Sequence, residues 1–287
     1  MKLTGINAII TGASQGLGLE IARHFVQEGA GIALCARDKG RLADAAAGLR
    51  KLARPGQIIF AAPCDVSNPS DVTSFCAAAV AALGTVRVLV NNAGVYGPKG
   101  PIEAVEWEAW KQALEINLYG VVLPCRALIP HFKAQGGGKI INLSGGGATS
   151  PLPFISAYAA SKAAVVRFTE TLAGELRDHH IDVNAVAPGA LNTRMLDEIL
   201  EAGPKVVGES FHRKALKQKE GGGASLDLGS KLCVFLASAE SDRITGKLIS
   251  AVWDPWKDLP ARRGKLGDSD IYTLRRIVPE DRGEKWS

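Results

Sequence analysis

Two side chains that could perform acid–base chemistry, Tyr158 and Lys162, lie four positions apart in the stretch SAYAASK at 156–162. On a helix, residues four apart share a face, so the phenol and the ammonium group would point the same way. A cation beside a phenol favours the phenolate and lowers a pKa that is otherwise about 10. Such a phenol can exchange a proton with an alcohol or an alkoxide near neutral pH. Tyrosine and lysine also fall four apart by chance on surface helices, so the pair gains meaning only from the elements around it.

A glycine-rich turn near the start of the chain predicts a phosphate-binding site. The apolar run at 6–10 is typical of a buried parallel strand, and the turn TGASQGLG at 11–18 follows it directly. Leu17, Ile21 and Phe25 then repeat at a spacing of four, which predicts a helix. Glycines let the backbone approach a pyrophosphate, and a helix N-terminus presents free N–H groups. The spacing G-x-x-x-G-x-G differs from the commoner dinucleotide fingerprint.

The end of the second predicted strand, at 32–36, is the place where dinucleotide-binding folds recognise the ribose of their ligand. In dinucleotide-binding folds an acidic residue at this place binds the ribose hydroxyls, whereas a basic one accommodates a 2′-phosphate. Here Ala36 holds the end position and Arg37 follows it, which favours NADP over NAD. The alternative is that Arg37 is a solvated residue and that Asp38 is the N-cap of the next helix.

The remaining elements alternate between strand and helix. Further strands are predicted at 58–62, 86–90, 139–144, 181–187 and 247–252, and the helix with Tyr158 and Lys162 runs to about His179. This alternation predicts an α/β fold with a doubly wound parallel sheet, of the Rossmann type. The polar segment at about 194–224 has the character of a mobile helical lid. We therefore expect a single domain at 1–252 and a C-terminal extension at 253–287.

The composition argues against several functional classes. The net charge is +5 over 287 residues without one long basic run, so nucleic-acid binding is not indicated. The five cysteines form no CxxC pair and no Cys/His cluster, so we expect free thiols in a reducing compartment and no metal site. No stretch approaches the ~18 apolar residues of a membrane helix, and the first residues do not resemble a signal peptide. We expect a cytoplasmic protein that does not bind membranes.

In this order the motifs resemble those of the short-chain dehydrogenase/reductase family, in its shorter single-domain branch. The resemblance covers roughly residues 4–252. Its motifs are TGxxxGxG at 11–18, Asp65, NNAG at 91–94, Asn117, the pair Tyr158 and Lys162, and Pro188-Gly189 followed by Thr193. The family implies a nicotinamide cofactor that lies across the carboxyl ends of the strands.

The resemblance also implies roles for individual residues. Tyr158 would be the acid/base, Lys162 would hold the nicotinamide ribose and lower the tyrosine pKa, and Asn117 would anchor a water that relays protons. Asp65 would lie near the adenine and Thr193 near the carboxamide. The expected cofactor-binding residues are Gly12, Ser14, Gln15, Gly16, Leu17, Gly18, Arg37, Asp65, Val66, Asn91, Ala93, Gly94, Tyr158, Lys162, Pro188, Gly189 and Thr193. Taken singly, the asparagines and Thr193 could instead be caps of turns and helices.

One position of the site departs from the family pattern. The family usually places a catalytic serine thirteen residues before the tyrosine, where it hydrogen-bonds the substrate oxygen, and that position is Gly145 here. An extra residue in the turn at 145–147 would let Ser144 take this role. Otherwise the role is vacant or falls to Thr149 or Ser156. We take Ser144 as the catalytic candidate. A vacant position would lower activity, because losing such a donor costs a few kcal/mol of transition-state stabilisation.

The end of the chain also departs from the family pattern. The family often closes its last strand with Asp-Gly-Gly, whereas this chain runs AVWDPW at 251–256 and continues to residue 287. One interpretation is a tail that packs on the body or on a neighbouring subunit through its tryptophans. The other is a roof over the substrate pocket that supplies an arginine to an anionic or sugar-like substrate.

The resemblance thus implies an enzyme that interconverts a secondary alcohol and a ketone on a small molecule by hydride transfer. We expect NADP(H) as the preferred cofactor, with NAD possible, and a homodimer or homotetramer formed through the long helices. Two alternatives stay open. Gly145 would suit a dinucleotide-binding sensor or scaffold without turnover, and the same fold supports dehydratases and epimerases.

Overall fold

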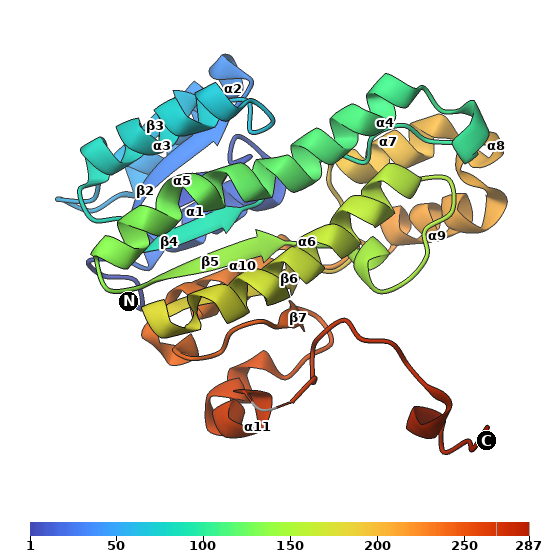
Figure 1. Ribbon diagram of the computed structural model, residues 1–287. Helices are drawn as coiled ribbons and strands as arrows, with labels where there is room; N and C mark the ends of the chain where they lie inside the picture. Colours follow the sequence, from blue (N-terminus) through green and yellow to red (C-terminus); the bar gives the residue numbers. More distant parts are fainter. Residues whose placement is uncertain (268, 287) are drawn as a thin grey trace.

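Seven parallel strands form one continuous sheet in the computed structural model, which describes residues 1–267 and 269–286 (Figure 1). The strand order is β3-β2-β1-β4-β5-β6-β7. The strands are β1 Asn7–Thr11, β2 Gly31–Ala36, β3 Ile59–Pro63, β4 Val88–Asn91, β5 Gly138–Leu143, β6 Ile181–Ala187 and β7 Leu248–Ser250. Every neighbouring pair is parallel. The predicted doubly wound, Rossmann-type single domain is confirmed, and each predicted strand overlaps an observed one.

Helices cover both faces of this sheet. They are α1 Gly16–Gln27, α2 Lys39–Leu52, α3 Pro69–Leu83, α4 Trp107–Leu114, α5 Gly120–Ala134, α6 Ser156–Leu176 and α10 Leu226–Ala237. Successive strand residues point to opposite faces, so Ile10 and Ile32 pack on the side of α1, α2 and α10, while Ile9 and Ala33 pack on the side of α3, α5 and α6. Both faces are buried, which explains why the strands read as unbroken apolar runs.

The long helical segment Trp107–Ala134 joins α4, a π-helical turn at Glu115–Tyr119 and α5. By length and composition it is apolar enough to cross a membrane, contrary to our expectation that no stretch is. It instead contacts α3, β4 and β5 along the sheet, with Leu128 and Phe132 fully buried. These contacts are those of a core helix. A buried core helix can be as long and as apolar as a membrane-spanning one.

The predicted lid is a group of three short helices, α7 Arg194–Ala202, α8 Pro204–Val207 and α9 Glu209–Glu220. In Figure 1 they extend past the ends of α4 and α6. A small apolar cluster of Leu196, Ile199, Val207 and Ala215 joins them to Ile155 on the body. The lid is therefore packed against the domain through one patch at the end of the sheet.

The C-terminal extension packs along the body below β7 (Figure 1). Its 3₁₀ turn Trp256–Arg262 and the short helix α11 Arg263–Gly267 bury Trp256, Leu259 and Leu266 in the core. The Trp256 ring lies 5.5 Å from that of Phe235 on α10. The amide of Leu248 donates to the carbonyl of Tyr272 at 2.8 Å. The extension thereby covers the edge of the sheet that β7 would otherwise expose.

Candidate active site

A cavity of about 1200 Å³ opens at the carboxyl ends of the strands. The chain crosses from β1 outward to β2 and β3, and then returns to β4 on the other side of β1. Crossovers diverge at that point, so the carboxyl ends of β1 and β4 leave a crevice between them. The cavity runs from this crevice to the lid, and its walls include the turn before α1, the loop after β4 and the N-terminal half of α6.

The turn between β1 and α1 is packed so tightly that side chains are excluded from it. Gly12 has a φ of +64°, and a Cβ there would lie 2.7 Å from the Cα of Ala93. A Cβ on Gly18 would overlap the carbonyl oxygen of Gly12. No side chain caps the N-terminus of α1, although Gln15 holds the N-cap position. Free N–H groups at a helix start that lines a large cavity fit the pyrophosphate of a dinucleotide.

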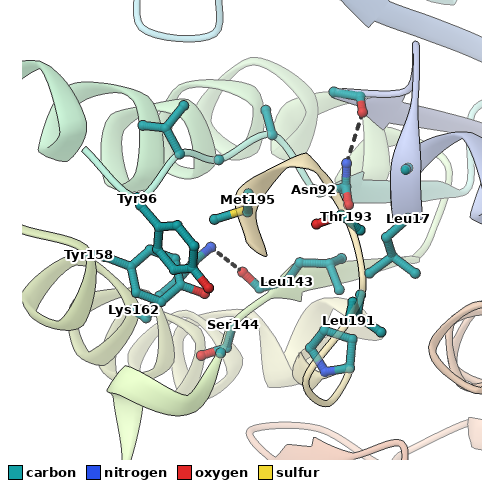
Figure 2. Close-up of a pocket in the computed structure, with 18 of the residues that line it drawn as sticks. Leu17, Asn92, Tyr96, Leu143, Ser144, Tyr158, Lys162, Leu191, Thr193 and Met195 are labelled. Atoms are coloured by element: carbon teal, nitrogen blue, oxygen red, sulfur yellow. Dashed lines mark hydrogen bonds between the residues drawn. The ribbon is translucent and has the colours of Figure 1, made fainter. Parts of the chain in front are cut away.

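Asn92 connects this turn to the end of β4. Its side-chain amide, visible in Figure 2, donates to the carbonyls of Thr11 and Gly12, both at 3.0 Å. Thr11 Oγ1 accepts from the amides of Asn92 and Ala93. Sequence reasoning chose Asn91 instead. Asn91 does not line the cavity, because its side chain is buried and donates to Asn142 Oδ1 at 2.9 Å. The NNAG motif thus contributes its second asparagine to the site.

Two arginines lie at the outer end of the cavity. Arg37 is exposed and lines the wall. Asp38 caps α2, as its carboxylate accepts from the amide of Arg41 at 3.0 Å. The two interpretations of this sequence are therefore compatible. Arg41, which the sequence did not suggest, also lines the cavity and donates to Gln15 Oε1 at 3.1 Å.

Tyr158 and Lys162 lie on one face of α6 and both line the cavity (Figure 2). The ammonium group is 5.7 Å from the centre of the Tyr158 ring. It donates to the carbonyl of Leu143, at the end of β5, at 2.8 Å. Lys162 is 4% exposed, so its charge is held inside the protein by one backbone oxygen.

The pKa of Tyr158 differs from the expectation. Burial raises this pKa well above the usual value of a phenol, and the charge of Tyr96 adds to the rise. The predicted lowering by Lys162 is not found, because the ammonium group is directed at the Leu143 carbonyl and not at the phenol oxygen. Burial also lowers the pKa of Lys162 to about 8, which makes this lysine a weaker source of positive charge.

Asn117 lies behind the cavity wall, in the π-helical turn. Its side chain accepts from the amide of Val95 and donates to the carbonyl of Val95, both at 2.8 Å, and also donates to Ser161 Oγ at 2.9 Å. A Cβ on Gly94 would lie 3.3 Å from Asn117 Oδ1 and 3.5 Å from Lys162 Nζ. The expected neighbourhood of Asn117 and Lys162 is therefore present. Asn117 also fixes the loop that follows β4.

The position thirteen residues before the tyrosine faces the phenol directly. A Cβ on Gly145 would overlap the hydroxyl oxygen of Tyr158. Ser144 precedes it, and its hydroxyl is buried with no hydrogen-bond partner in the described chain. Successive residues of an extended chain point to opposite sides, and Figure 2 shows the Ser144 side chain directed away from the phenol. The proposed donor role of Ser144 stays a prediction that this conformation does not display.

The two alternative donors differ in position. Thr149 lines the cavity, whereas Ser156 accepts a hydrogen bond from Trp110 Nε1 at 3.1 Å and lies outside it.

Tyr96 is a site residue that sequence reasoning missed. Its ring lies edge-on to that of Tyr158, with centroids 4.8 Å apart and planes at 67°. Figure 2 shows the two hydroxyls at the same end of the crossed rings. The nearby walls are apolar and come from Leu152, Met195 and Phe211. Only the fold brings Tyr96, two residues beyond the NNAG motif, onto Tyr158, so no local pattern could have indicated it.

Most of the predicted residues meet at the cavity. Those that line it are Gly12, Ser14, Gln15, Gly16, Leu17, Gly18, Arg37, Asp65, Val66, Ala93, Gly94, Ser144, Tyr158, Lys162, Pro188, Gly189 and Thr193. Within 1–267 and 269–286 the lining ends at Asp254, so no arginine of the extension reaches the cavity. Residues 1–267 and 269–286 contain no group of three or more His, Cys, Asp or Glu side chains that could hold a metal ion.

Comparison with known proteins places these features in a family. The family model described as short chain dehydrogenase matches residues 7–203. The chain is 33% identical to "Probable galactose dehydrogenase GalD" of Rhizobium meliloti (strain 1021) over 239 residues, which cover 83% of this chain and 90% of the relative.

Two solved structures of similar fold carry cofactors. A gluconate 5-dehydrogenase from Burkholderia cenocepacia J2315, in complex with NADP and tartrate, is 29% identical with a TM-score of 0.76, over 87% of this chain and 94% of the other. A 7α-hydroxysteroid dehydrogenase in complex with NADH and 7-oxo glycochenodeoxycholic acid is 27% identical with a TM-score of 0.77, over 87% and 93%.

Proposed function

This chain belongs to the short-chain dehydrogenase/reductase family, and from that premise we propose an NADP(H)-preferring enzyme that interconverts a ketone and a secondary alcohol with Tyr158 as the acid/base. That it is an NAD(P)-dependent oxidoreductase follows from the family. The observation that carries the finer proposal is one cavity that contains the Tyr158 phenol, the Lys162 ammonium group and the uncapped start of α1.

The residues of this chain supply positioning and proton transfer. When bound, the nicotinamide gives or accepts the hydride. Tyr158 donates its proton to the oxygen of the ketone, and its raised pKa keeps the phenol protonated at neutral pH. Lys162, with a pKa of about 8, can lose and regain a proton near that pH, which supports a part in returning the proton to Tyr158. Asn117 and this ammonium group both border Gly94, and this shared neighbourhood supports the same relay.

The preference for NADP is supported by charge at the outer end of the cavity. Arg37 and Arg41 bring two guanidinium groups there, and the one carboxylate between them, Asp38, is engaged by Arg41. Guanidinium groups bind phosphate through several planar donors, so this end suits a 2′-phosphate.

The substrate end of the cavity supports a ketone with an apolar body. Around the two phenols the wall is apolar. Among the polar side chains on the lid side, Asn192 and Gln218 bond to each other and to backbone carbonyls. Arg194 there pairs with Glu198. A polyhydroxylated sugar would therefore find few free partners, whereas an aromatic ketone such as α-tetralone would fill the site.

A homo-oligomer is supported by the exposed surface of the long helical segment and of the 3₁₀ turn Ile102–Ala104 before it. Ile102, Trp107 and Tyr119 are each more than half exposed, and Trp107 stacks on Trp110 with ring centres 5.5 Å apart. Apolar surface of this kind is typical of interfaces between protein chains. We therefore propose that copies of the chain associate through this surface.

The first test measures turnover with NADPH and NADH side by side, using α-tetralone and D-galactose as probes. We expect NADPH to be preferred, α-tetralone to be the better substrate, and Tyr158→Phe to abolish turnover. Arg37→Ala should raise the KM for NADPH about tenfold or more and leave that for NADH unchanged. Lys39→Ala, which removes a nearby charge outside the cavity, is the matched control. Turnover that survives in Tyr158→Phe would contradict the proposal.

A further inference from the structure

The site holds only one conspicuous donor for the substrate oxygen if Tyr158 acts alone. A carbonyl oxygen has two lone pairs, and the charge that develops on it during reduction is stabilised best by two directed donors. A serine is excluded at position 145 as the site stands, because even a Cβ there would overlap the Tyr158 hydroxyl. The Ser144 hydroxyl is buried and has no hydrogen-bond partner in the described chain, so it makes no hydrogen bond to Tyr158. Thr149 and Tyr96 both line the cavity and could supply a second donor, and of these Tyr96 is the one whose ring packs against that of Tyr158.

Tyr96 has the chemistry and the placement for this task. Its ring and that of Tyr158 meet edge to face at 4.8 Å, and Figure 2 shows both hydroxyls at one end of the pair. In the part of the chain that the structure describes, neither hydroxyl has a hydrogen-bond partner. Neither belongs with the fully buried unpaired atoms such as Ser144 Oγ, because both residues line the cavity. Two unsatisfied phenol donors therefore face the same cavity side by side.

The loop that carries Tyr96 is held from several sides. Asn117 bonds both backbone groups of Val95, the preceding residue. A Cβ on Gly97, the following residue, would overlap Ala113 on α4, so the loop lies directly on that helix. Contacts of this kind fix a side chain before substrate arrives, which is what an effective transition-state donor requires.

We propose that Tyr96 donates the second hydrogen bond to the substrate's carbonyl oxygen and takes the place of the serine that is absent at position 145. The inference depends on the proposed role of Tyr158. In the reduction, the hydride forms the new C–H bond and Tyr158 transfers its proton to the oxygen. Tyr96 keeps its own proton throughout. Burial and the carboxylate of Glu198 raise the pKa of Tyr96, so it remains a donor at neutral pH.

Tyr96→Phe tests the proposal, because it removes the hydroxyl and keeps the ring that packs on Tyr158. With α-tetralone and NADPH we expect kcat to fall about 100-fold. NADPH binding, followed by cofactor fluorescence, and the melting temperature should not change. Tyr119→Phe is the matched control, since Tyr119 is 51% exposed and outside the cavity.

A second readout does not depend on turnover. The lactam 3,4-dihydroisoquinolin-1(2H)-one has the shape of α-tetralone and a carbonyl that cannot accept hydride. Its affinity for the NADPH-loaded enzyme should fall roughly three- to tenfold in Tyr96→Phe and in Tyr158→Phe, as expected for one lost hydrogen bond.

The pattern of outcomes separates the two proposals. Wild-type turnover and lactam affinity in Tyr96→Phe, with an inactive Tyr158→Phe, would overturn the role of Tyr96 alone. An active Tyr158→Phe would overturn the proposed function first. A wild-type enzyme that neither reduces the ketone nor binds the lactam would overturn the apolar ketone site, and with it the donor role of Tyr96.

Discussion

At the scale of single residues, burial affects the pKa values of Tyr158 and Lys162 more than the proximity of the two groups does. Tyr158 and Lys162 share a helix face as their spacing predicts, yet the ammonium group is held by the Leu143 carbonyl. Removal from water disfavours the charged form of both groups, which raises the pKa of the phenol and lowers that of the amine. Tyr158 therefore stays neutral at neutral pH, and Lys162 loses its charge at a lower pH than an exposed lysine does.

Lys162 should make the stability of the protein depend on pH. Its pKa is about 8 in the folded protein against 10.5 for an ordinary lysine. Below pH 8 the buried charge destabilises the fold, and this penalty disappears as the pH rises from 8 to 10.5. Relative to Lys162→Met, the wild type should therefore gain about 3 kcal/mol in free energy of unfolding over this range. Urea denaturation at pH 7.5 and pH 10.5 measures the difference.

The control for this experiment is Lys39→Met, which changes an exposed lysine. Its difference from the wild type should be the same at both pH values. If Lys162→Met behaves in the same way, the ammonium group is not buried as described.

At the scale of elements, the connection between β5 and α6 determines where the phenol lies. Gly145 has extended backbone, with a φ of −176°, which any residue can adopt. A glycine is required there only because the Tyr158 hydroxyl occupies the space of a side chain. The connection and α6 are thus packed so closely that position 145 has no room for a side chain, which explains why no serine is found there.

Gly145→Ala should therefore displace the Tyr158 hydroxyl and lower kcat about 100-fold, the usual effect of misplacing a reacting group by ~1 Å. Gly145→Ser is expected to do the same and not to increase activity. Steady-state kinetics with α-tetralone and NADPH measure both variants. Gly146→Ala is the control, because a Cβ on Gly146 meets nothing within 4 Å. Equal activity of the two alanine variants would refute the described position of the phenol.

Local patterns were enough to predict the elements but not the contacts between them. Strand β6 was predicted at its observed bounds, because apolar runs and turn residues are read along the chain. Most of the predicted cofactor wall also met at the cavity, since parallel strands bring their carboxyl ends to one edge. The sequence could not predict that Tyr96 and Arg41 line the cavity, or that Asn92 does so in place of Asn91. Each depends on which side chain faces across a gap between distant segments.

At the scale of the whole molecule, the first part of the C-terminal extension, residues 256–267, contributes to the core of the domain. Trp256 is 8% exposed and Leu259 2%, and both pack with residues from α1, α10 and the sheet. The extension therefore stabilises the edge at β7, and its arginines form contacts remote from the cavity, such as that of Arg275 with Asp281 at 2.6 Å. The lid and the loop after β4 line the cavity beside Tyr158, with Met195 and Tyr96 among their residues.

Trp256→Ala should lower the free energy of unfolding by about 3 kcal/mol, because it leaves a cavity beside Phe235. Trp253 offers a matched control on the same segment, since it is 84% exposed, and Trp253→Ala should change stability by about 0.5 kcal/mol or less. Urea denaturation compares the two variants. Equal losses would show that the extension does not pack as described.

The strand order also has a consequence for how the protein is made. β1 lies in the middle of the sheet, and one of its edges stays unpaired until β4 leaves the ribosome. Asn92, whose side chain hydrogen-bonds the carbonyls of Thr11 and Gly12 in the glycine turn, is synthesised directly after β4. Tyr158 follows only after β5, and β7 closes the sheet last. We infer that a growing chain can pair β1 with β4 and form the glycine turn between β1 and α1 before Tyr158 has been synthesised.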